Sequence, residues 1–587
     1  MTENLLEKKY NYVLCDSFDA LEHYYKIGLK KSIPVITSSP KILSSKKING
    51  INLYKNWSTY KFKKFQKTIL DFTLEVFKNL NSNKSISREE KLLVAIYANR
   101  YQSFLLKISQ LEENLKKKKI LFIRVSEQFY NLKAINPPWD YLFKKNKNFE
   151  IKTFYPTKKK PLFSKTNYLE RLYMGGLETI FFRIFSFLST YLRNLSSKRL
   201  IIISENELLI EASLKFLFQG YIPINLSSLK KEKITNQEKK IKKVKKLIHR
   251  TIARRLSKYV KKTYRKDCIN YFFENLNNLY GEYQYWLFYF EKNIDNLYKN
   301  QNKSVLLSNH PATPKGLAAK NVFNKRKIKL ISFQHGVAAE ISGSHNNLLS
   351  QHDSSSSDQY YAFNNAAVSV AAENPFNVAQ HYVYGMPKRY RRQKNIFKFR
   401  KKYPILFLSN MLYRGNDGRI HTWVNDYEFF NIESDLIKII STNLNKQVFY
   451  KPYPASFKRY EEKDPILEEI DSYKNVHIIK NNKDARYLTG NSRLIICSTS
   501  SSTVSWAIMS NIPVVFINLP NIAPLKKEAI PYFEKGLFLF NYNNKYSMKK
   551  LRKLLSLNFK DINKIWNEKI IYRNKLIQTY ISSKRDI

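Results

Sequence analysis

The sequence predicts an α/β protein with two domains of parallel sheet and helix that face a central cleft. Short, continuous runs of β-branched and aromatic residues recur along the chain, as in strands that are buried on both faces. Helix-like stretches separate these runs, and this alternation favours parallel sheets. With 587 residues, the chain is also too long for one hydrophobic core, which stops growing at about 250–300 residues.

The expected strands fall into two series, one on each side of a basic stretch between Pro387 and Lys402 that has the composition of a linker. We therefore expect an N-terminal domain over residues 1–390, with helical insertions at about 205–300, and a C-terminal domain over residues 400–587. Ligands of such folds bind at the carboxyl ends of the strands. The expected strands are Tyr12–Cys15, Ile120–Val125, Leu200–Ser204, Val305–Ser308, Ile328–Phe333, Tyr360–Phe363 and Tyr382–Tyr384, then Ile405–Ser409, Gln447–Tyr450, Val476–Ile479, Leu494–Cys497 and Val514–Ile517.

The chain is strongly basic, with a formal net charge of +55. Such a charge attracts nucleic acid, anionic lipid headgroups or phosphorylated substrates, although a genomic bias toward lysine codons explains it as well. Residues 230–266 hold 17 lysines and arginines, with apolar residues at helical spacing between Ile241 and Tyr259. This basic amphipathic helix either packs on the domain as an insertion or lies on an anionic membrane. No RNA-binding motif accompanies it, so no nucleic-acid partner is expected.

No run reaches the ~20 apolar residues that a membrane span requires, and the polar start of the chain does not have the pattern of a signal peptide. The nearest run, residues 176–192, is interrupted by Glu178 and Arg183. It fits an interfacial helix or, as we favour, a buried core helix. The three cysteines are scattered, which indicates a reducing compartment and a cytoplasmic location.

Two histidines end neighbouring strands of the N-terminal domain. His310 precedes a helix start with Pro311, Pro314 and Lys315, which is either an anion site or a simple turn. His335 stands in Gln-His-Gly at the tip of a buried strand, where packing does not explain it.

A long polar loop over residues 337–358 follows, and it suits a mobile acceptor-binding loop or a disordered segment. It contains Glu340, His345, His352 and Asp353. The last three have no specific ligand spacing, so no metal is expected.

The C-terminal domain carries three candidate anion sites. Arg414 lies in a glycine-containing turn and Lys451 at a strand tip. The strand that ends at Cys497 leads into six consecutive Ser and Thr residues and then a helix, and such a turn can cradle a phosphate. N-capping explains one of these hydroxyl residues but not six. This unit is the strongest phosphate signal in the chain.

The order of three motifs resembles bacterial surface-polysaccharide transferases of the GT-B fold, namely CDP-glycerol glycerophosphotransferases and Kdo-type capsule transferases. These motifs are Gln334-His335-Gly336, Lys451-Pro452-Tyr453-Pro454, and STSSSTVSWAIMSNIPVVFI from Ser498. The resemblance covers roughly residues 300–540, and the architecture is also similar to that of UDP-N-acetylglucosamine 2-epimerases. Tyr453 stands where the family usually has histidine, and a phenol cannot carry an imidazolium charge.

The resemblance implies two Rossmann-like domains, no cofactor, a nucleotide-sugar donor held mainly by the C-terminal domain, and a glycan or lipid-linked acceptor at the inner membrane surface. It assigns donor phosphate to Ser500, Ser501, Ser502 and Thr503, and a catalytic or phosphate-contacting role to His335. With Arg414, Lys451 and His310 near the phosphates, His335 is the expected general base, with Glu340 and Asp353 as alternatives. The alternative functions are a nucleotide-sugar 2-epimerase and a non-enzymatic protein that binds polyanions or membranes.

Overall fold

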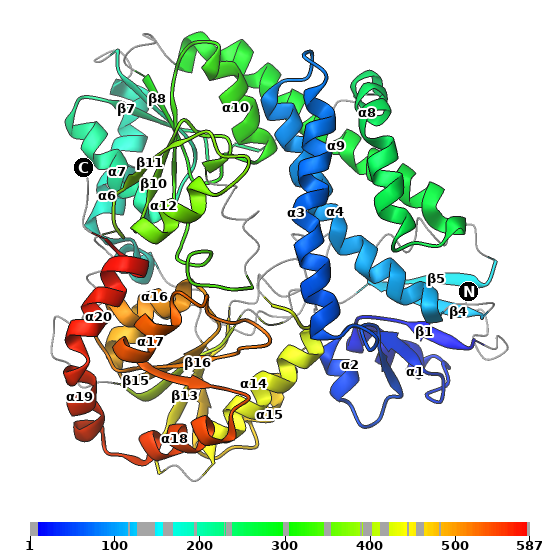
Figure 1. Ribbon diagram of the computed structural model, residues 1–587, viewed down its shortest axis with the longest axis vertical. Helices are drawn as coiled ribbons and strands as arrows, with labels where there is room; N and C mark the ends of the chain where they lie inside the picture. The colour runs from blue at the N-terminus through cyan, green and yellow to red at the C-terminus, as the bar shows by residue number, and fades with distance from the viewer. Residues whose placement is uncertain are drawn as a thin grey trace.

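Three parallel sheets form the three lobes of the computed structural model, coloured blue to cyan, teal to light green, and yellow to red in chain order in Figure 1. The structure describes residues 10–583 except 115–117, 126–146, 156–167, 193–196, 228, 231–237, 298–303, 345–353, 388–389, 391–401, 411, 413–421, 443–444, 454–462 and 481–482.

The N-terminal sheet has five parallel strands in the order β3-β2-β1-β4-β5. Its strands are β1 (Tyr12–Leu14), β2 (Val35–Thr37), β3 (Gly50–Asn52), β4 (Ile120–Val125) and β5 (Phe149–Phe154). The helices of this part are α1 (Phe18–Lys26), α2 (Pro40–Ser44), α3 (Thr59–Asn81) and α4 (Arg88–Asn114).

The middle sheet has six parallel strands in the order β11-β10-β9-β8-β6-β7. Its strands are β6 (Arg199–Ser204), β7 (Ile222–Asn225), β8 (Ser304–Ser308), β9 (Leu330–Phe333), β10 (Gln359–Ala362) and β11 (Gln380–Val383). The helices of this part are α6 (Tyr168–Leu192), α7 (Glu207–Phe218), α8 (Glu238–Ser257), α9 (Lys262–Leu297), α10 (Pro314–Asn324) and α12 (Asn365–Ala372).

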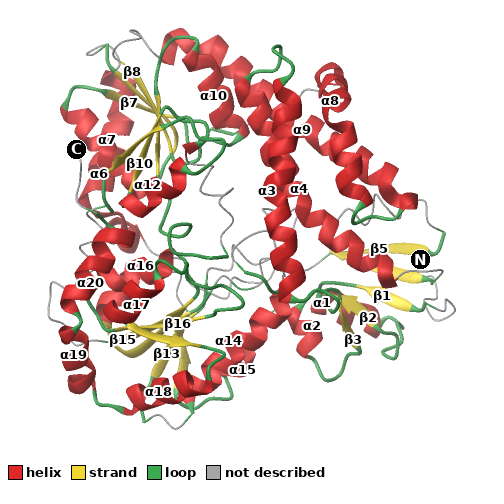
Figure 2. Cartoon of the chain, viewed as in Figure 1, coloured by secondary structure: helices red, strands yellow, loops and turns green. Residues whose placement is uncertain are grey.

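The C-terminal sheet also has six parallel strands, in the order β14-β13-β12-β15-β16-β17. Its strands are β12 (Tyr403–Leu408), β13 (Val448–Lys451), β14 (Val476–Ile478), β15 (Ser492–Ser498), β16 (Val514–Asn518) and β17 (Phe538–Asn541). The helical segments are α14 (Asp426–Ser441), α15 (Pro465–Ile470), η4 (Ala485–Tyr487), η5 (Thr489–Asn491), α16 (Ser502–Met509), α17 (Ile530–Gly536), α18 (Lys545–Ser556), α19 (Phe559–Glu568), α20 (Ile570–Leu576) and η6 (Ile577–Ile581). Figure 2 shows helices covering the strands of each sheet.

The predicted α/β class is confirmed, and all twelve expected runs contain a strand. The middle and C-terminal sheets form two Rossmann-like halves of parallel sheet and helix, and the chain passes from one to the other between residues 383 and 403, as the linker predicts. The N-terminal sheet is an addition that the two-domain prediction did not contain. The exact limits of the domains, 1–390 and 400–587, stay a prediction.

The basic stretch near residue 240 forms helix α8, and its apolar stripe is buried against α3 and α9. Ile248 and Leu256 are both 0% exposed, for example. This outcome confirms a packed insertion, because the apolar face is not available to a bilayer. Most of the basic side chains of α8 lie on its outward face, whereas Arg255 is buried and donates to Gln102 and Thr68.

Our preference for a buried core helix at residues 176–192 is wrong for one face of α6. Phe182 is buried, but Leu177, Phe181 and Phe187 are 63%, 52% and 69% exposed. The helix packs on α7 and β7 with its other face. Within the described residues, no helix is sufficiently long and apolar to cross a bilayer.

The two six-stranded halves are joined by more than the linker. After α20, the chain returns to the middle sheet, where Ser583 N donates to Phe363 O and Asn364 Nδ2 donates to Tyr580 O. On another part of the junction, Arg486 donates to Glu207 Oε1 over 2.8 Å. These contacts set the relative position of the two sheets.

Helix α3 of the N-terminal part also reaches both halves. The Gln66 side chain donates to Ser344 O over 2.7 Å and accepts from Trp423 Nε1 over 2.7 Å. Figure 1 shows α3 running from the middle lobe to the C-terminal lobe. The N-terminal part therefore braces the junction of the other two.

Candidate functional site

Two strand tips of the middle sheet bring together the two histidines that the sequence singles out. Strands β8 and β9 are neighbours, and the rings of His310 and His335 lie 4.9 Å apart between centroids. Both Asn309 N and His310 N donate to Ser204 Oγ at the end of β6. Gly316 is needed here, because a Cβ at this position would lie 2.3 Å from Pro311 O.

A chain of asparagine amides fixes the environment of the His335 ring. Asn206 caps α7 by accepting from Leu209 N, so its Nδ2 must point the other way, where it donates to Asn309 Oδ1 and Gln334 O. Asn309 Nδ2 is thereby turned toward His335 Nδ1, at 3.4 Å. A neutral ring that accepts at Nδ1 carries its proton on Nε2 and presents a donor there.

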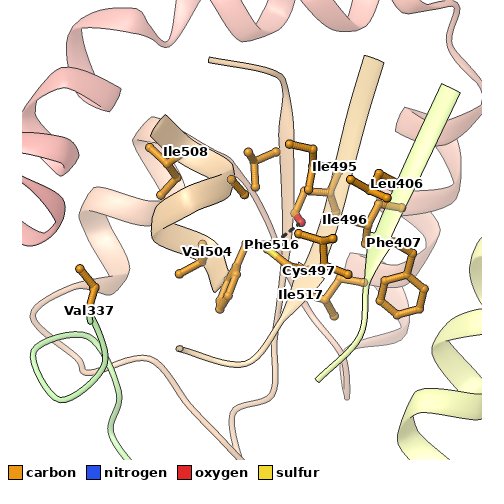
Figure 3. Close-up of a cluster of buried hydrophobic side chains, with 14 of the residues drawn as sticks. Val337, Leu406, Phe407, Ile495, Ile496, Cys497, Val504, Ile508, Phe516 and Ile517 are labelled. Carbon is orange, nitrogen blue, oxygen red and sulfur yellow. Dashed lines mark hydrogen bonds between the residues drawn. The ribbon is translucent and has the colours of Figure 1, made fainter. Parts of the chain in front are cut away.

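The loop after His335 connects the two halves of the molecule. Gly343 N donates to Pro524 O over 2.8 Å, and Lys526 N donates to Ile341 O over 2.8 Å. Val337 belongs to the same buried cluster as Val504 of α16, beside which Figure 3 draws it. The loop is thus packed on the C-terminal half rather than free in solvent.

Glu340 has a place in this loop that favours structural support over proton transfer. It is 3% exposed, and its carboxylate accepts from Gln334 Nε2, Asn364 Nδ2 and Ala338 N. Burial raises the pKa of Glu340, and these hydrogen bonds oppose the rise. Because its oxygens are occupied inside the protein, the alternative of Glu340 as the general base finds no support in this geometry.

The hydroxyl-rich turn meets the His335 loop. A Cβ at Gly336 would lie 3.1 Å from Ser502 Cβ, so the residue after His335 touches the first residue of helix α16. Ser501 is the N-cap of this helix but makes no capping bond with its side chain. The N-terminal end of helix α16, where the first N–H groups of a helix lack intrahelical partners, therefore meets the loop that carries His335.

The backbone of the turn is strained at Thr499, which has a φ of 69°. The left-handed region is costly for a β-branched residue, on the order of 1–3 kcal/mol. Of the hydroxyls assigned to phosphate, that of Ser500 is occupied, since it donates to Pro524 O over 3.2 Å. Ser501, Ser502 and Thr503 remain the candidates at the helix start.

Lys451 lies on the same edge of the C-terminal sheet. It pairs with Leu408, and Leu408 pairs with Cys497, so the lysine and the turn follow strands separated by one strand. Neighbouring strands are about 4.8 Å apart, so the two strand tips lie roughly 10 Å from each other. Burial lowers the pKa of Lys451 to about 8, and Asp484 opposes this fall.

Four predicted residues, Asp353, Arg414, His345 and His352, lie outside the described residues. Among the residues that the structure describes, no group of three or more His, Cys, Asp or Glu side chains is placed to hold a metal ion.

Sequence reasoning missed the asparagines that organise the site. Asn206, Asn309 and Asn410 each follow closely on the end of a strand, β6, β8 and β12. Their common position after a strand tip is the only signal that could have identified them, and it is weak in a single sequence.

The model of a family described as LIC12162 family transferase matches residues 151–535, more than half of the chain. None of the curated proteins matches.

Among solved structures, the putative UDP-N-acetylglucosamine 2-epimerase from Listeria monocytogenes is 12% identical, with a TM-score of 0.36 over 66% of this chain and 93% of that one. Anabaena Alr3699/HepE in complex with UDP-glucose is 10% identical, with a TM-score of 0.35 over 65% and 95%. MurG from Acinetobacter baumannii is 11% identical, with a TM-score of 0.30 over 66% and 94%. These likenesses are distant.

Proposed function

The chain belongs to the LIC12162 family of transferases, and from that premise we propose that it is a glycosyltransferase, or a related glycerophosphotransferase-like enzyme. It moves a sugar from a nucleotide-activated donor to a surface glycan or lipid-linked acceptor. The observation that carries the proposal is the contact between Gly336 and Ser502, which joins the histidine loop to the hydroxyl-rich turn.

In this proposal the C-terminal half binds the donor. The N–H groups at the start of α16 and the Ser501, Ser502 and Thr503 hydroxyls contact the phosphates, and the Lys451 ammonium offsets their charge. No metal is required, because these groups stabilise the negative charge that develops on the leaving phosphate. Arg414 is proposed as a further phosphate ligand on the strength of the sequence alone.

His335 faces the donor from the opposite half, with His310 beside it. If Asn309 donates to Nδ1, the neutral ring presents Nε2–H, which suits a hydrogen bond to a phosphate oxygen. General-base catalysis through Nε2 needs the other tautomer. The phosphate-contacting role therefore has more support than the general-base role, and the two roles respond differently to substitution.

The donor can be identified by thermal shift with CMP, CDP, UDP and GDP. A true ligand at a concentration of 100 times its Kd stabilises the folded state by about 2.7 kcal/mol. For a domain of about 150–250 residues, such as the C-terminal half, this raises the Tm by about 5–10 °C. We expect one nucleotide to give such a shift, and Ser501→Ala combined with Ser502→Ala to reduce it. Equal shifts from any polyanion, abolished by salt, would instead support a non-enzymatic polyanion-binding protein.

The same experiment leads to a test against the epimerase alternative. The nucleotide-sugar of the stabilising base is incubated with the enzyme in the absence of an acceptor. A transferase leaves the sugar configuration unchanged under these conditions. Isomerisation of the free nucleotide-sugar would contradict the proposal.

We also propose peripheral attachment to the inner face of the cytoplasmic membrane, with the exposed face of α6 in contact with anionic lipid. This face presents Phe181, Phe187 and Tyr191, which are 52%, 69% and 76% exposed, on a helix that also carries Arg183. The formal net charge of +55 complements an anionic surface. A lipid-linked acceptor would be reached from such a position.

Vesicle co-sedimentation tests the attachment. Phe181→Ser combined with Phe187→Ser is expected to weaken binding to vesicles of equal phosphatidylglycerol and phosphatidylcholine by about tenfold or more, because it removes two large apolar contacts. Phe288→Ser is the matched control, since Phe288 is 66% exposed on α9. Equal binding by both variants would contradict a role of α6.

A further inference from the structure

A buried carboxylate lies behind the proposed phosphate site. Glu433 is on helix α14 and is 0% exposed. Its Oε1 accepts from the Tyr450 hydroxyl over 3.0 Å, and its Oε2 accepts from Asn410 Nδ2 over 3.0 Å. Burial raises the pKa of Glu433 to about 7, while its hydrogen bonds favour the charged form. Burying a carboxyl group costs free energy unless hydrogen bonds compensate for its lost hydration. The hydrogen bonds from Tyr450 and Asn410 provide such compensation.

One partner leads directly to the hydroxyl-rich turn. Asn410 Nδ2 also donates to Ser498 Oγ over 2.6 Å, and Asn410 Oδ1 accepts from Thr499 Oγ1 over 2.6 Å. In its ionised form the Glu433 carboxylate can only accept, so it then faces the NH₂ end of the Asn410 amide. The carbonyl end is thereby directed to Thr499, the residue whose backbone is in the left-handed region.

The other partner leads to the tip that carries the buried lysine. Tyr450 immediately precedes Lys451 on β13, and its hydroxyl also lies 2.8 Å from Ser409 Oγ. Ser409 N in turn donates to Lys451 O over 3.1 Å. Glu433 on α14 therefore contacts both Asn410, which bonds to the turn, and Tyr450, which precedes the lysine.

We propose that Glu433 is a positioning residue for the donor-phosphate site, which holds the Ser498–Thr499 bend through Asn410 and the Lys451 strand tip through Tyr450. The inference rests on the proposed function, because it assigns phosphate binding to these two tips. Glu433 does not touch the donor. It sets the direction of the Asn410 amide, and this direction keeps the start of α16 in the conformation that accepts a phosphate.

Calorimetric titration with the nucleotide that most stabilises the wild type, among CMP, CDP, UDP and GDP, tests the proposal. Glu433→Gln replaces one of the two acceptor oxygens by an NH₂ group and removes the charge, so Asn410 and Tyr450 can no longer both donate to this side chain. We expect Kd to rise about tenfold or more, as for other lost hydrogen bonds to buried charges. Asn410→Ala should have a similar effect. The double variant should lose less affinity than the sum of the two single losses, because part of the effect of Glu433 passes through Asn410.

Glu469→Gln is the matched control. Glu469 accepts from Ser434, the residue after Glu433 on α14, but has no contact with the turn. Its variant should bind the nucleotide like the wild type. If Glu433→Gln does not fold, Tyr450→Phe removes one hydrogen-bond partner of Glu433 and should raise Kd several-fold.

The outcomes are distinguishable. An unchanged Kd in Glu433→Gln, or fully additive losses in the double variant, would overturn the positioning role while leaving the transferase proposal intact. If no nucleotide binds the wild type, the proposed function falls and the positioning role falls with it.

Discussion

Alanine at His335 is expected to lower the transfer rate by about two to four orders of magnitude, the range for loss of a group that contacts the leaving phosphate or transfers a proton. The side chain is exposed, so its removal should leave the melting temperature nearly unchanged. Donor binding should also be largely retained, because the turn and Lys451 belong to the other half. Turnover with the donor identified by thermal shift is the measurement.

Two further variants sharpen this test. His477→Ala is the control, since His477 lies on β14 and its ring contacts Gln447. His335→Gln retains a donor but cannot exchange a proton. Substantial activity in His335→Gln would favour the phosphate-contacting role, and no activity would favour general-base catalysis. Near-normal turnover in His335→Ala would reject both roles.

Methionine at Lys451 is expected to lower kcat/KM by about two to three orders of magnitude, because a preorganised charge at the leaving phosphate is lost. The lysine also predicts a pH dependence. Since its pKa in the folded protein is about 8, the ammonium loses its proton as the pH rises through 8, and donor Kd should increase there. Kd at pH 7, 8 and 9 should rise in the wild type and remain flat in Lys451→Met.

The same titration affects folding stability in the opposite direction, because stability increases with pH whereas donor binding weakens. The unfolded chain keeps the ordinary lysine pKa of 10.5, so between pH 8 and 10.5 it binds more protons than the folded state, and this group stabilises folding increasingly as the pH rises. Lys315 provides a control because burial also lowers its pKa to about 8, but its ammonium donates to Leu226 O and Leu229 O. A slope that persists in Lys451→Met and vanishes in Lys315→Met would contradict the assignment.

Ten of the twelve strands of the two large sheets could be predicted from sequence, because most of them are continuously apolar. Strands β7 and β17, each at an edge of its sheet, were missed. The missed strands of the N-terminal sheet give a weaker signal. Strands β2 and β3 have three residues each, and β5 alternates polar and apolar residues without a fully buried position. The N-terminal sheet was missed as a unit because β1 pairs with β4, and two long helices separate them in the chain.

The residues of the candidate site also divide into those that could be predicted from the sequence and those that could not. His335 and the hydroxyl-rich turn carry distinctive residue types at strand tips, so their meeting could be anticipated from the carboxyl-end rule for parallel sheets. The residues that hold these groups in place could not be predicted from the sequence. Asn309 and Asn410 act through amide directions that depend on tertiary neighbours, and Glu433 lies in an ordinary amphipathic helix pattern. Nothing in the α14 sequence distinguishes this buried carboxylate from the solvated ones beside it.

The return of the chain end to the middle sheet restricts how the two large halves can move. Two covalent crossings connect them, one between residues 383 and 403 and one through α20 and η6. A body tethered to another at two points can rotate about the line between those points but cannot slide or twist freely. Opening for product release is therefore expected to follow a single hinge axis, with the Ser502 and Gly336 backbones separating along an arc.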